Sequence, residues 1–317
     1  MNNQFQLSEL VRRVVRQRAL SRKTENAYLN HIKHFIEFIG DADLSVKRAA
    51  NIDRFLKHLG KNCSASTCNQ AHSALIFLYR EVLEQKLSAR FAQIKRLERQ
   101  VKTPQTFSHT EAKTVLKNLC GANFLAAALM YGAGLRISEV VALRVRDVDF
   151  EQFEIKVRSM RTGALNRTTI LPASIIVPLK RQMLKVEYQY EDDCLSGFGQ
   201  TILPKAVGRK YPNVADELAW QYLFPAVKLT PVGDGKSFVR LHLSESTVQK
   251  AVADAIEKAH LESYGGCQTL RYSFASRLSE QNCDAHAISR LLGHKNIKTT
   301  LNYFETHGKS SVRSPLD

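Results

Sequence analysis

The sequence predicts a mainly α-helical protein with a small antiparallel β-sheet, divided into two domains. Three observations support this fold class. Apolar residues recur at helical spacing through the first third, short β-branched runs flank Gly163, and a polar, basic stretch at 95–104 lies between the two regions. We expect residues 1–103 to form an N-terminal helical bundle and residues 104–317 to form a larger α+β domain.

Three amphipathic segments predict the N-terminal bundle. Residues 24–39 carry apolar side chains at spacings of four, three and four, with Thr24 as the expected N-cap and Gly40 as the stop. Two further apolar stripes follow, one at 52–59 that ends at Gly60 and one at 75–82 after a polar turn at 64–67. Short connections between such helices imply an antiparallel bundle.

The second domain begins after a linker that ends in Pro104. Ser108 and Glu111 fit a capping box, with Phe107 before it as the staple residue, and 109–142 should be helical. The expected strands are Asp147–Phe150, Phe153–Val157 and Arg167–Leu171, and further helical patterns lie at 174–190, 244–261 and 268–292.

Charge points to a polyanionic partner. The chain has 46 Lys and Arg against 30 Asp and Glu, and residues 1–100 alone carry 18 against 9, so both domains are basic. Nucleic acid contacted by both domains would explain this distribution, and a solvated basic surface with no partner is the alternative. Lys33 lies off the apolar stripe of its helix and is a candidate DNA contact.

Other classes of protein do not fit the composition. We find no apolar run long enough to span a bilayer and no signal-peptide core at the N-terminus. The six cysteines form no CxxC pair, and no His/Cys set has zinc spacing. We therefore expect a cytoplasmic protein with reduced thiols, no membrane partner and no metal site.

Three segments carry candidate catalytic residues: 131–143 with Arg136, 268–276 with Gln268 and Arg271, and 292–303 with His294 and Tyr303. Taken singly, each has an ordinary structural explanation, such as a surface arginine, a helix cap or a packed tyrosine.

In combination these residues suit phosphoryl transfer. Two arginines can hold the non-bridging oxygens of one phosphodiester, and a histidine can donate a hydrogen bond or move a proton. A tyrosine hydroxyl can attack phosphorus and leave a covalent phosphotyrosine and a free 5′-hydroxyl. The arginines would stabilise the pentavalent phosphorane, so the chemistry needs no metal and no other cofactor.

The motifs resemble those of the tyrosine recombinase (phage integrase) family. Residues 132–139 read Gly-x-Gly-Leu-Arg-x-Ser-Glu, and residues 292–303 read Leu-Gly-His-x-x-x-x-Thr-Thr-x-x-Tyr. The resemblance covers nearly the whole chain. It implies a SAM-like core-binding domain followed by the α+β catalytic domain, and it places the nucleophile on Tyr303, the phosphate-binding arginines on Arg136 and Arg271, and the active-site histidine on His294. It also implies site-specific recombination by a homotetramer on two paired DNA sites, in the bacterial cytoplasm at the nucleoid.

An extra segment narrows the resemblance to integron integrases. Residues 187–226 form an insertion that most tyrosine recombinases lack, and the tail at 308–317 also looks like theirs. The resemblance implies integration or excision of gene cassettes, whose site is a folded single strand read partly through unpaired bases. Trp220 is a candidate for stacking on such a base, with core packing as the alternative. His242 is a candidate base reader, although Leu241 replaces the first histidine of the family's usual pair.

Two positions depart from the family's active site. Gln268 stands where the family usually has histidine, and an amide cannot transfer a proton at neutral pH. The lysine expected in the hairpin loop falls on Thr162, and the neighbouring candidates are Arg161, which we also expect to contact DNA, and Lys156. The family's general acid is that lysine, so we expect reduced activity. The alternatives are another phage-type or chromosome-resolving recombinase, or a catalytically impaired DNA-binding relic of an integrase.

Overall fold

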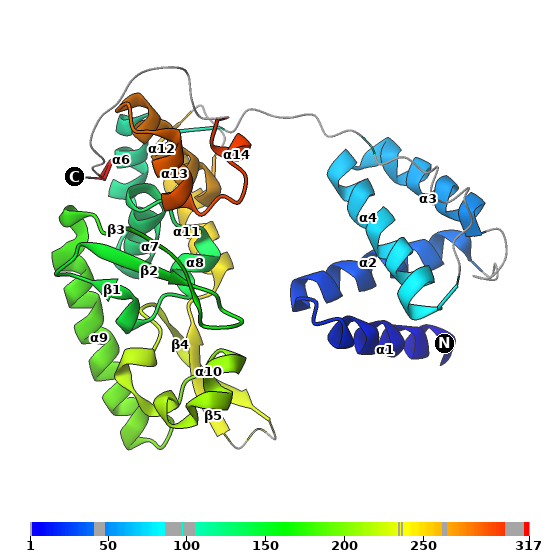
Figure 1. Cartoon of the computed structure of the whole chain (residues 1–317), viewed down its shortest axis with the longest axis horizontal. Helices are drawn as coiled ribbons and strands as arrows, with labels where there is room; N and C mark the ends of the chain where they lie inside the picture. Colours follow the sequence, from blue (N-terminus) through cyan, green and yellow to red (C-terminus); the bar gives the residue numbers. More distant parts are fainter. Residues whose placement is uncertain are drawn as a thin grey trace. The chain divides into compact units, whose positions relative to one another are not determined.

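Helices dominate both units into which the chain divides, Met1–Lys102 and Thr103–Asp317, shown in a computed structural model in Figure 1. The structure describes residues 2–40, 48–85, 97, 105–233, 235, 237–261, 265–301 and 314–316. The mainly helical fold with small antiparallel sheets confirms the predicted fold class.

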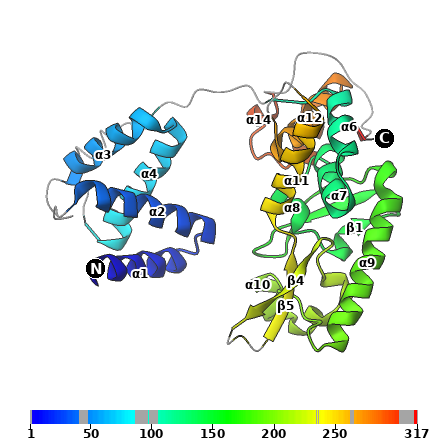
Figure 2. The same cartoon turned by 180° about the vertical axis from the view of Figure 1, so that it is seen from behind.

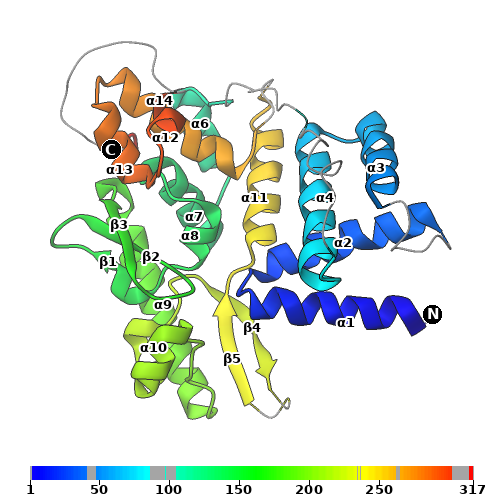
Figure 3. The ribbon, with the colours of Figure 1, turned by 45° about the vertical axis from the view of Figure 1, so that its right-hand side comes forward.

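The first unit is built around aromatic side chains. Its described elements are α1 (Asn2–Gln17), α2 (Arg22–Ile39), α3 (Arg48–Asn62), α4 (Ala65–Phe77) and a π-helical turn at Leu78–Val82. Figure 3 shows α1 and α2 side by side. Phe35 lies edge-on to Phe55 and to Tyr79, with ring centroids 5.3 and 6.4 Å apart, and all three rings are buried. This is the core that the apolar stripes predict.

The helix ends differ from the sequence-based expectation in three places. Ser21, not Thr24, caps α2, because the Ser21 hydroxyl accepts the backbone N–H of Thr24 at 3.1 Å. Ser64 caps α4 in the same way, so the expected polar turn is the first turn of a helix. Gly60 lies inside α3 instead of ending it. Helix α1 was missed, because its apolar stripe is set among arginines and carries no recognisable cap.

The second unit begins with the predicted capping box. The Ser108 hydroxyl accepts the backbone N–H of Glu111, and the Glu111 carboxylate accepts that of Ser108. Three helices follow: α6 (His109–Lys117), α7 (Gly121–Gly132) and α8 (Ile137–Val141). Residues 125–132 of α7 are all buried, so this helix is the centre of the core. Helices α6, α8, α9 (Ile176–Leu195), α11 (Glu245–Lys258) and α12 (Cys267–Glu280) contact it.

The predicted hairpin sheet is confirmed. Strands β1 (Val148–Asp149), β2 (Glu154–Arg158) and β3 (Leu165–Ile170) form an antiparallel sheet in that order. In the β2–β3 register Val157 pairs with Arg167, and the register shifts after Val157. The pairing fixes which residues the connecting turn at 159–164 presents at the end of the sheet.

A second sheet was not predicted. After α9 (Ile176–Leu195) and α10 (Lys205–Lys210), strands β4 (Pro225–Val232) and β5 (Ser237–His242) form an antiparallel pair. The apolar alternation of β4 is broken by prolines and a lysine, so its sequence gives little strand signal. A buried ion pair fastens the pair to α9, since Arg240 contacts both carboxylate oxygens of Asp193 at 2.5 and 2.6 Å.

The remaining helices gather at the other end of the unit. They are α11 (Glu245–Lys258), α12 (Cys267–Glu280), α13 (Ala285–Leu292) and α14 (Lys298–Leu301). Figures 1 and 2 show α12 and α14 at the end away from β4 and β5, with α9 running along one side. The Ser314 hydroxyl donates to the carbonyl of Gly132, which docks the last described residues on α7. Within the described part of the chain no helix is long and apolar enough to cross a membrane.

Candidate active site

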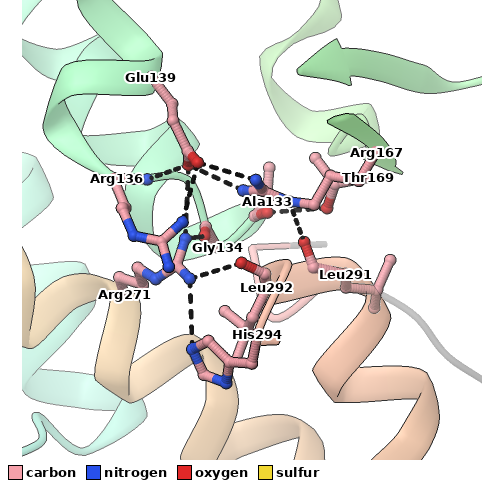
Figure 4. Close-up of polar contacts among 10 residues, drawn as sticks. All are labelled: Ala133, Gly134, Arg136, Glu139, Arg167, Thr169, Arg271, Leu291, Leu292 and His294. Carbon is pink, nitrogen blue, oxygen red and sulfur yellow. Dashed lines mark hydrogen bonds and ion pairs between the residues drawn. The ribbon is translucent and has the colours of Figure 1, made fainter. Parts of the chain in front are cut away.

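Arg136 enters the site at the start of α8. It is the N-cap of that helix, and its backbone N–H donates to Glu139 at 2.8 Å while its guanidinium donates to the same carboxylate at 2.9 Å. The side chain keeps 40% of its surface exposed. Glu139 therefore holds both the backbone and the guanidinium of Arg136, as Figure 4 shows, while part of the side chain stays open to solvent.

Arg271 reaches the same carboxylate from α12. Its side chain is 2% exposed, and two of its nitrogens donate at 2.6 Å to the carbonyls of Gly134 and Leu292. The Glu139 carboxylate lies 3.4 Å away. A guanidinium stays charged at any physiological pH, so these contacts fix a buried positive charge beside the N-terminus of α8.

Arg167 on β3 was missed as a site residue by the sequence analysis. Two of its nitrogens contact the two oxygens of Glu139 at 2.8 Å each, and its Nε donates to the carbonyl of Leu291 at 2.6 Å. The side chain is 9% exposed. Arg167 therefore ties the sheet to α8 and to the end of α13, as Figure 4 shows. The bidentate geometry is the one in which arginine pairs most strongly with a carboxylate.

Glu139 was also missed, although it closes the motif at 132–139. Burial alone would raise its pKa, but the hydrogen bonds and charge of Arg167, the backbone N–H of Arg136 and the charge of Arg271 together lower the pKa to about 2. The carboxylate is therefore ionised throughout the physiological range. A carboxylate three residues after a motif arginine was the signal that could have identified it, since that spacing is one helical turn.

His294 completes the cluster. Its Nε2 lies 3.4 Å from a guanidinium nitrogen of Arg271, and its Nδ1 lies 2.8 Å from the hydroxyl oxygen of Thr300. Burial lowers its pKa to about 4, helped by the positive charges of Arg271, Arg136 and Arg167 and opposed by Glu139. The imidazole is therefore neutral at pH 7 in the unliganded protein.

The cluster is suited to an anion. Three guanidiniums converge on one carboxylate, so the site keeps an excess of positive charge even with Glu139 ionised. Charge-assisted bonds from arginine are the usual way to hold phosphate oxygens. In the described residues no group of three or more His, Cys, Asp or Glu side chains could hold a metal ion.

Gln268 lies on α12 one turn before Arg271, with its side chain exposed. Tyr303 lies outside the described residues, which reach Leu301 on that side. The structure thus brings together Arg136, Arg271 and His294, and the role of Tyr303 stays a prediction.

The turn between β2 and β3 carries Arg161 and Thr162, both exposed. The Thr162 backbone N–H donates to the Ser159 hydroxyl, and the Thr162 hydroxyl accepts the N–H of Ala164, each at 3.3 Å. The ammonium of Lys156 on β2 contacts the carboxylate of Asp149 on β1 at 3.0 Å. Of the three, Lys156 is thus already engaged in an ion pair on the sheet.

A second group of candidates lies in the segment 202–242, away from the arginine cluster in sequence. Trp220 is 7% exposed, and the guanidinium carbon of the exposed Arg146 lies 4.3 Å from its ring centroid. Arg144 is buried and lies 4.4 Å from the ring of Tyr222, which in turn meets His242 edge-on at 5.2 Å. Arginines and rings therefore alternate from Arg146 through Trp220 and Arg144 to Tyr222, and His242 lies against the last ring.

The insertion also packs against the β2–β3 turn. Arg144 donates to the carbonyls of Trp220 and Ile202. A cavity of about 190 Å³ is lined by residues of the turn and of the insertion, including Met160 and Pro204.

Lys33, the candidate DNA contact in the first unit, is exposed to solvent. Its ammonium nitrogen lies 3.8 Å from a carboxylate oxygen of Glu37.

Comparison with known proteins agrees with this geometry. The sequence profile described as "Phage integrase family" matches residues 93–309, and that described as "Phage integrase, N-terminal SAM-like domain" matches residues 7–89. An "Integrase/recombinase" of Escherichia coli is 34% identical over 305 residues, covering 94% of this chain and 89% of the relative. The "Tyrosine recombinase XerD" of Lacticaseibacillus casei is 24% identical, covering 90% and 89%.

Solved structures have the same fold. The Tn1549 transposon integrase superposes with a TM-score of 0.63 at 16% identity, covering 96% of this chain and 95% of its own. A lambda integrase dimer gives 0.63 at 16% identity, covering 99% and 98%.

Proposed function

The chain belongs to the phage integrase family of tyrosine recombinases, and from this premise we propose that it is a site-specific DNA recombinase. The observation that carries the proposal is the convergence of Arg136, Arg271 and His294 on one positively charged site. The related integrases of Tn1549 and lambda were solved bound to DNA, which supports DNA as the substrate.

In the proposed reaction the Tyr303 oxygen attacks phosphorus of the scissile phosphodiester. A bond from the tyrosine oxygen to phosphorus forms, the bond to the 5′-oxygen breaks, and the tyrosine proton leaves to a base. The 5′-oxygen gains a proton and departs as a hydroxyl, which leaves a 3′-phosphotyrosine. Arg136 and Arg271 hold the non-bridging oxygens and stabilise the negative charge of the phosphorane.

Religation reverses these steps with a different strand. The 5′-hydroxyl of a partner strand attacks the phosphotyrosine, and the tyrosine oxygen leaves with a proton. The phosphodiester bond is exchanged, not consumed, so strand transfer needs no nucleotide cofactor. Two such exchanges on paired sites, carried out by a homotetramer, would complete recombination.

Within this class we propose an integron-type enzyme that moves gene cassettes in the bacterial cytoplasm. The insertion at about 187–226 supports it, because Trp220 lies there and His242 follows on β5. In this account Trp220 stacks on an unpaired base of a folded single strand and His242 reads the same site. Arg161 and Lys33 would contact the DNA backbone, one in each domain.

A test is covalent capture from fragmented genomic DNA of the source organism. The protein is incubated with the fragments as duplex or as refolded single strands, denatured, and recovered with any attached strand for sequencing. Attachment to one dominant sequence, mainly from refolded single strands, is expected of an integron-type recombinase. Attachment to duplex only would favour a phage-type or chromosome-resolving enzyme, and recovery only under native conditions would favour a DNA-binding relic.

A further inference from the structure

The ring of His294 is held from both sides, and the two sides have different chemistry. Its Nε2 faces a guanidinium nitrogen of Arg271 at 3.4 Å, and its Nδ1 faces the hydroxyl oxygen of Thr300 at 2.8 Å. A guanidinium only donates hydrogen bonds, whereas a hydroxyl can donate or accept. The side of the ring that faces Arg271 must therefore be the accepting side.

This decides the tautomer of the neutral ring. An N–H on Nε2 would point at another donor, so the proton belongs on Nδ1, where it is donated to Thr300. The charged groups around the ring are Arg271 on α12, Arg136 before α8, Arg167 on β3 and Glu139 on α8. Burial, together with three positive charges against one negative charge, lowers the pKa of the ring and keeps it neutral in the unliganded protein.

Thr300 is placed to serve as this acceptor. It lies on α14 with 0% of its surface exposed, and its backbone N–H donates to the carbonyl of Ile297 at 2.8 Å. Thr299, the preceding residue, is exposed. A buried hydroxyl that lost its partner would be costly, so the contact with His294 also holds α14 against the arginine cluster.

We propose that Thr300 is a positioning residue of the active site: its hydroxyl accepts the Nδ1–H of His294 and fixes an unprotonated Nε2 towards the arginines. The proposal rests on the proposed function. A phosphate bound to Arg271 brings negative charge to Nε2, where the ring then takes a proton from solvent and becomes a further donor to phosphate oxygen. The Nδ1–H bond to Thr300 is the same before and after, so the ring gains this proton without turning.

The first test measures the tautomer directly in the full-length protein. Long-range ¹H–¹⁵N spectra with ¹⁵N-histidine distinguish a protonated from an unprotonated ring nitrogen, and a His294→Gln variant identifies the His294 signals. At pH 7 we expect a protonated Nδ1 and an unprotonated Nε2 in the wild type and in Thr300→Ser. A protonated Nε2 in the wild type overturns the proposal, whatever the activity of the protein.

The second test measures single-turnover cleavage of a nicked DNA site with three variants. Thr300→Val should lower the rate about tenfold or more with unchanged DNA affinity, because the ring loses the acceptor that fixes its tautomer and orientation. Thr300→Ser should retain most of the rate, and Thr299→Val, the matched exposed control, should equal the wild type.

The two tests separate the possible failures. Equal rates for Thr300→Val and the wild type overturn the positioning role, as does a Thr300→Ser variant that is as slow as Thr300→Val although it folds. If the wild type forms no covalent adduct, the proposed function fails and takes the positioning role with it, while the spectra still decide the tautomer.

Discussion

At the scale of single residues, Glu139 organises the cluster although it bears the opposite charge to the substrate. It contacts Arg136, Arg167 and Arg271, which would otherwise repel one another. A carboxylate with a pKa of about 2 stabilises the folded state above the pKa of an unfolded glutamate and loses that contribution as pH falls through 2. We therefore regard Glu139 as the residue that makes three close arginines compatible with folding.

Glu139→Gln tests this role. The variant should be less stable at pH 7 by about 3 kcal/mol, the free energy of a pKa shift of this size. The difference between wild type and variant should shrink to roughly half or less by pH 3, because an unfolded glutamate is by then protonated while the folded carboxylate, with a pKa of about 2, is still mostly ionised. Denaturant unfolding followed by the fluorescence of Trp220, the single tryptophan, reports on this domain. A difference equal at both pH values would contradict the role.

Thr162 marks the largest departure of the site from the family's chemistry. If the family's lysine protonates the leaving 5′-oxygen, Thr162→Lys should raise the single-turnover cleavage rate about tenfold or more, given the usual size of proton-transfer catalysis. The effect should appear in the rate and not in DNA affinity, because one charge adds little to a chain of net charge +16.

A substrate with a 5′-bridging phosphorothioate is the control for this prediction. Its sulfur leaves without needing much protonation, so wild type and Thr162→Lys should react at similar rates. An equal gain on both substrates would show that the lysine acts by positioning. No gain on either would favour Arg161 as the group that supplies the proton.

At the scale of elements, the insertion and the β2–β3 turn behave as one structure. Gly163 has φ +74, and a Cβ there would lie 2.6 Å from a methyl carbon of Val207 on α10. Only glycine meets both requirements without strain. The turn that carries Arg161 and Thr162 is therefore held by the insertion at 187–226.

The sequence predicted some elements better than others for identifiable reasons. The β1–β3 hairpin was predictable because its β-branched runs flank a glycine, and the capping box at Ser108 because both partners are local. Strands β4 and β5 were not, because a buried ion pair between Asp193 and Arg240 secures them and its partners lie 47 residues apart. Arg167 was missed for the same reason, since its partner Glu139 lies 28 residues away.

The fluorescence of Trp220 tests whether the insertion stacks on an unpaired base. Arg146 covers the ring, so stacking on a base requires that side chain to move. Arg146→Ala should uncover the ring and strengthen binding to a folded single strand with unpaired bases more than binding to duplex, since stacking is typically worth about 1–3 kcal/mol per base. Fluorescence titration measures both affinities. Quenching that is absent with every DNA would contradict stacking and favour a core role for Trp220.

At the scale of the whole molecule, both domains carry an excess of positive charge. Residues 1–100 carry 18 Lys and Arg against 9 Asp and Glu, and the rest of the chain is basic as well. Binding that neutralises six to ten phosphates should weaken about 10³–10⁵-fold between roughly 50 and 200 mM salt, because counterions are released. Fluorescence anisotropy with labelled DNA measures the slope. A nearly flat dependence would mean that few phosphates are neutralised, which would contradict binding of DNA by both basic domains.

The central claim is that this chain cleaves DNA through Tyr303, and a nicked suicide substrate tests it most directly. Loss of the short fragment beyond the nick prevents religation, so a cleaving enzyme accumulates as a protein–DNA adduct that survives a denaturing gel. We expect an adduct with the wild type and none with Tyr303→Phe, which lacks only the hydroxyl and should bind DNA equally well. An adduct at undiminished level with Tyr303→Phe would contradict the account, as would a wild type that binds the site and never becomes attached to it.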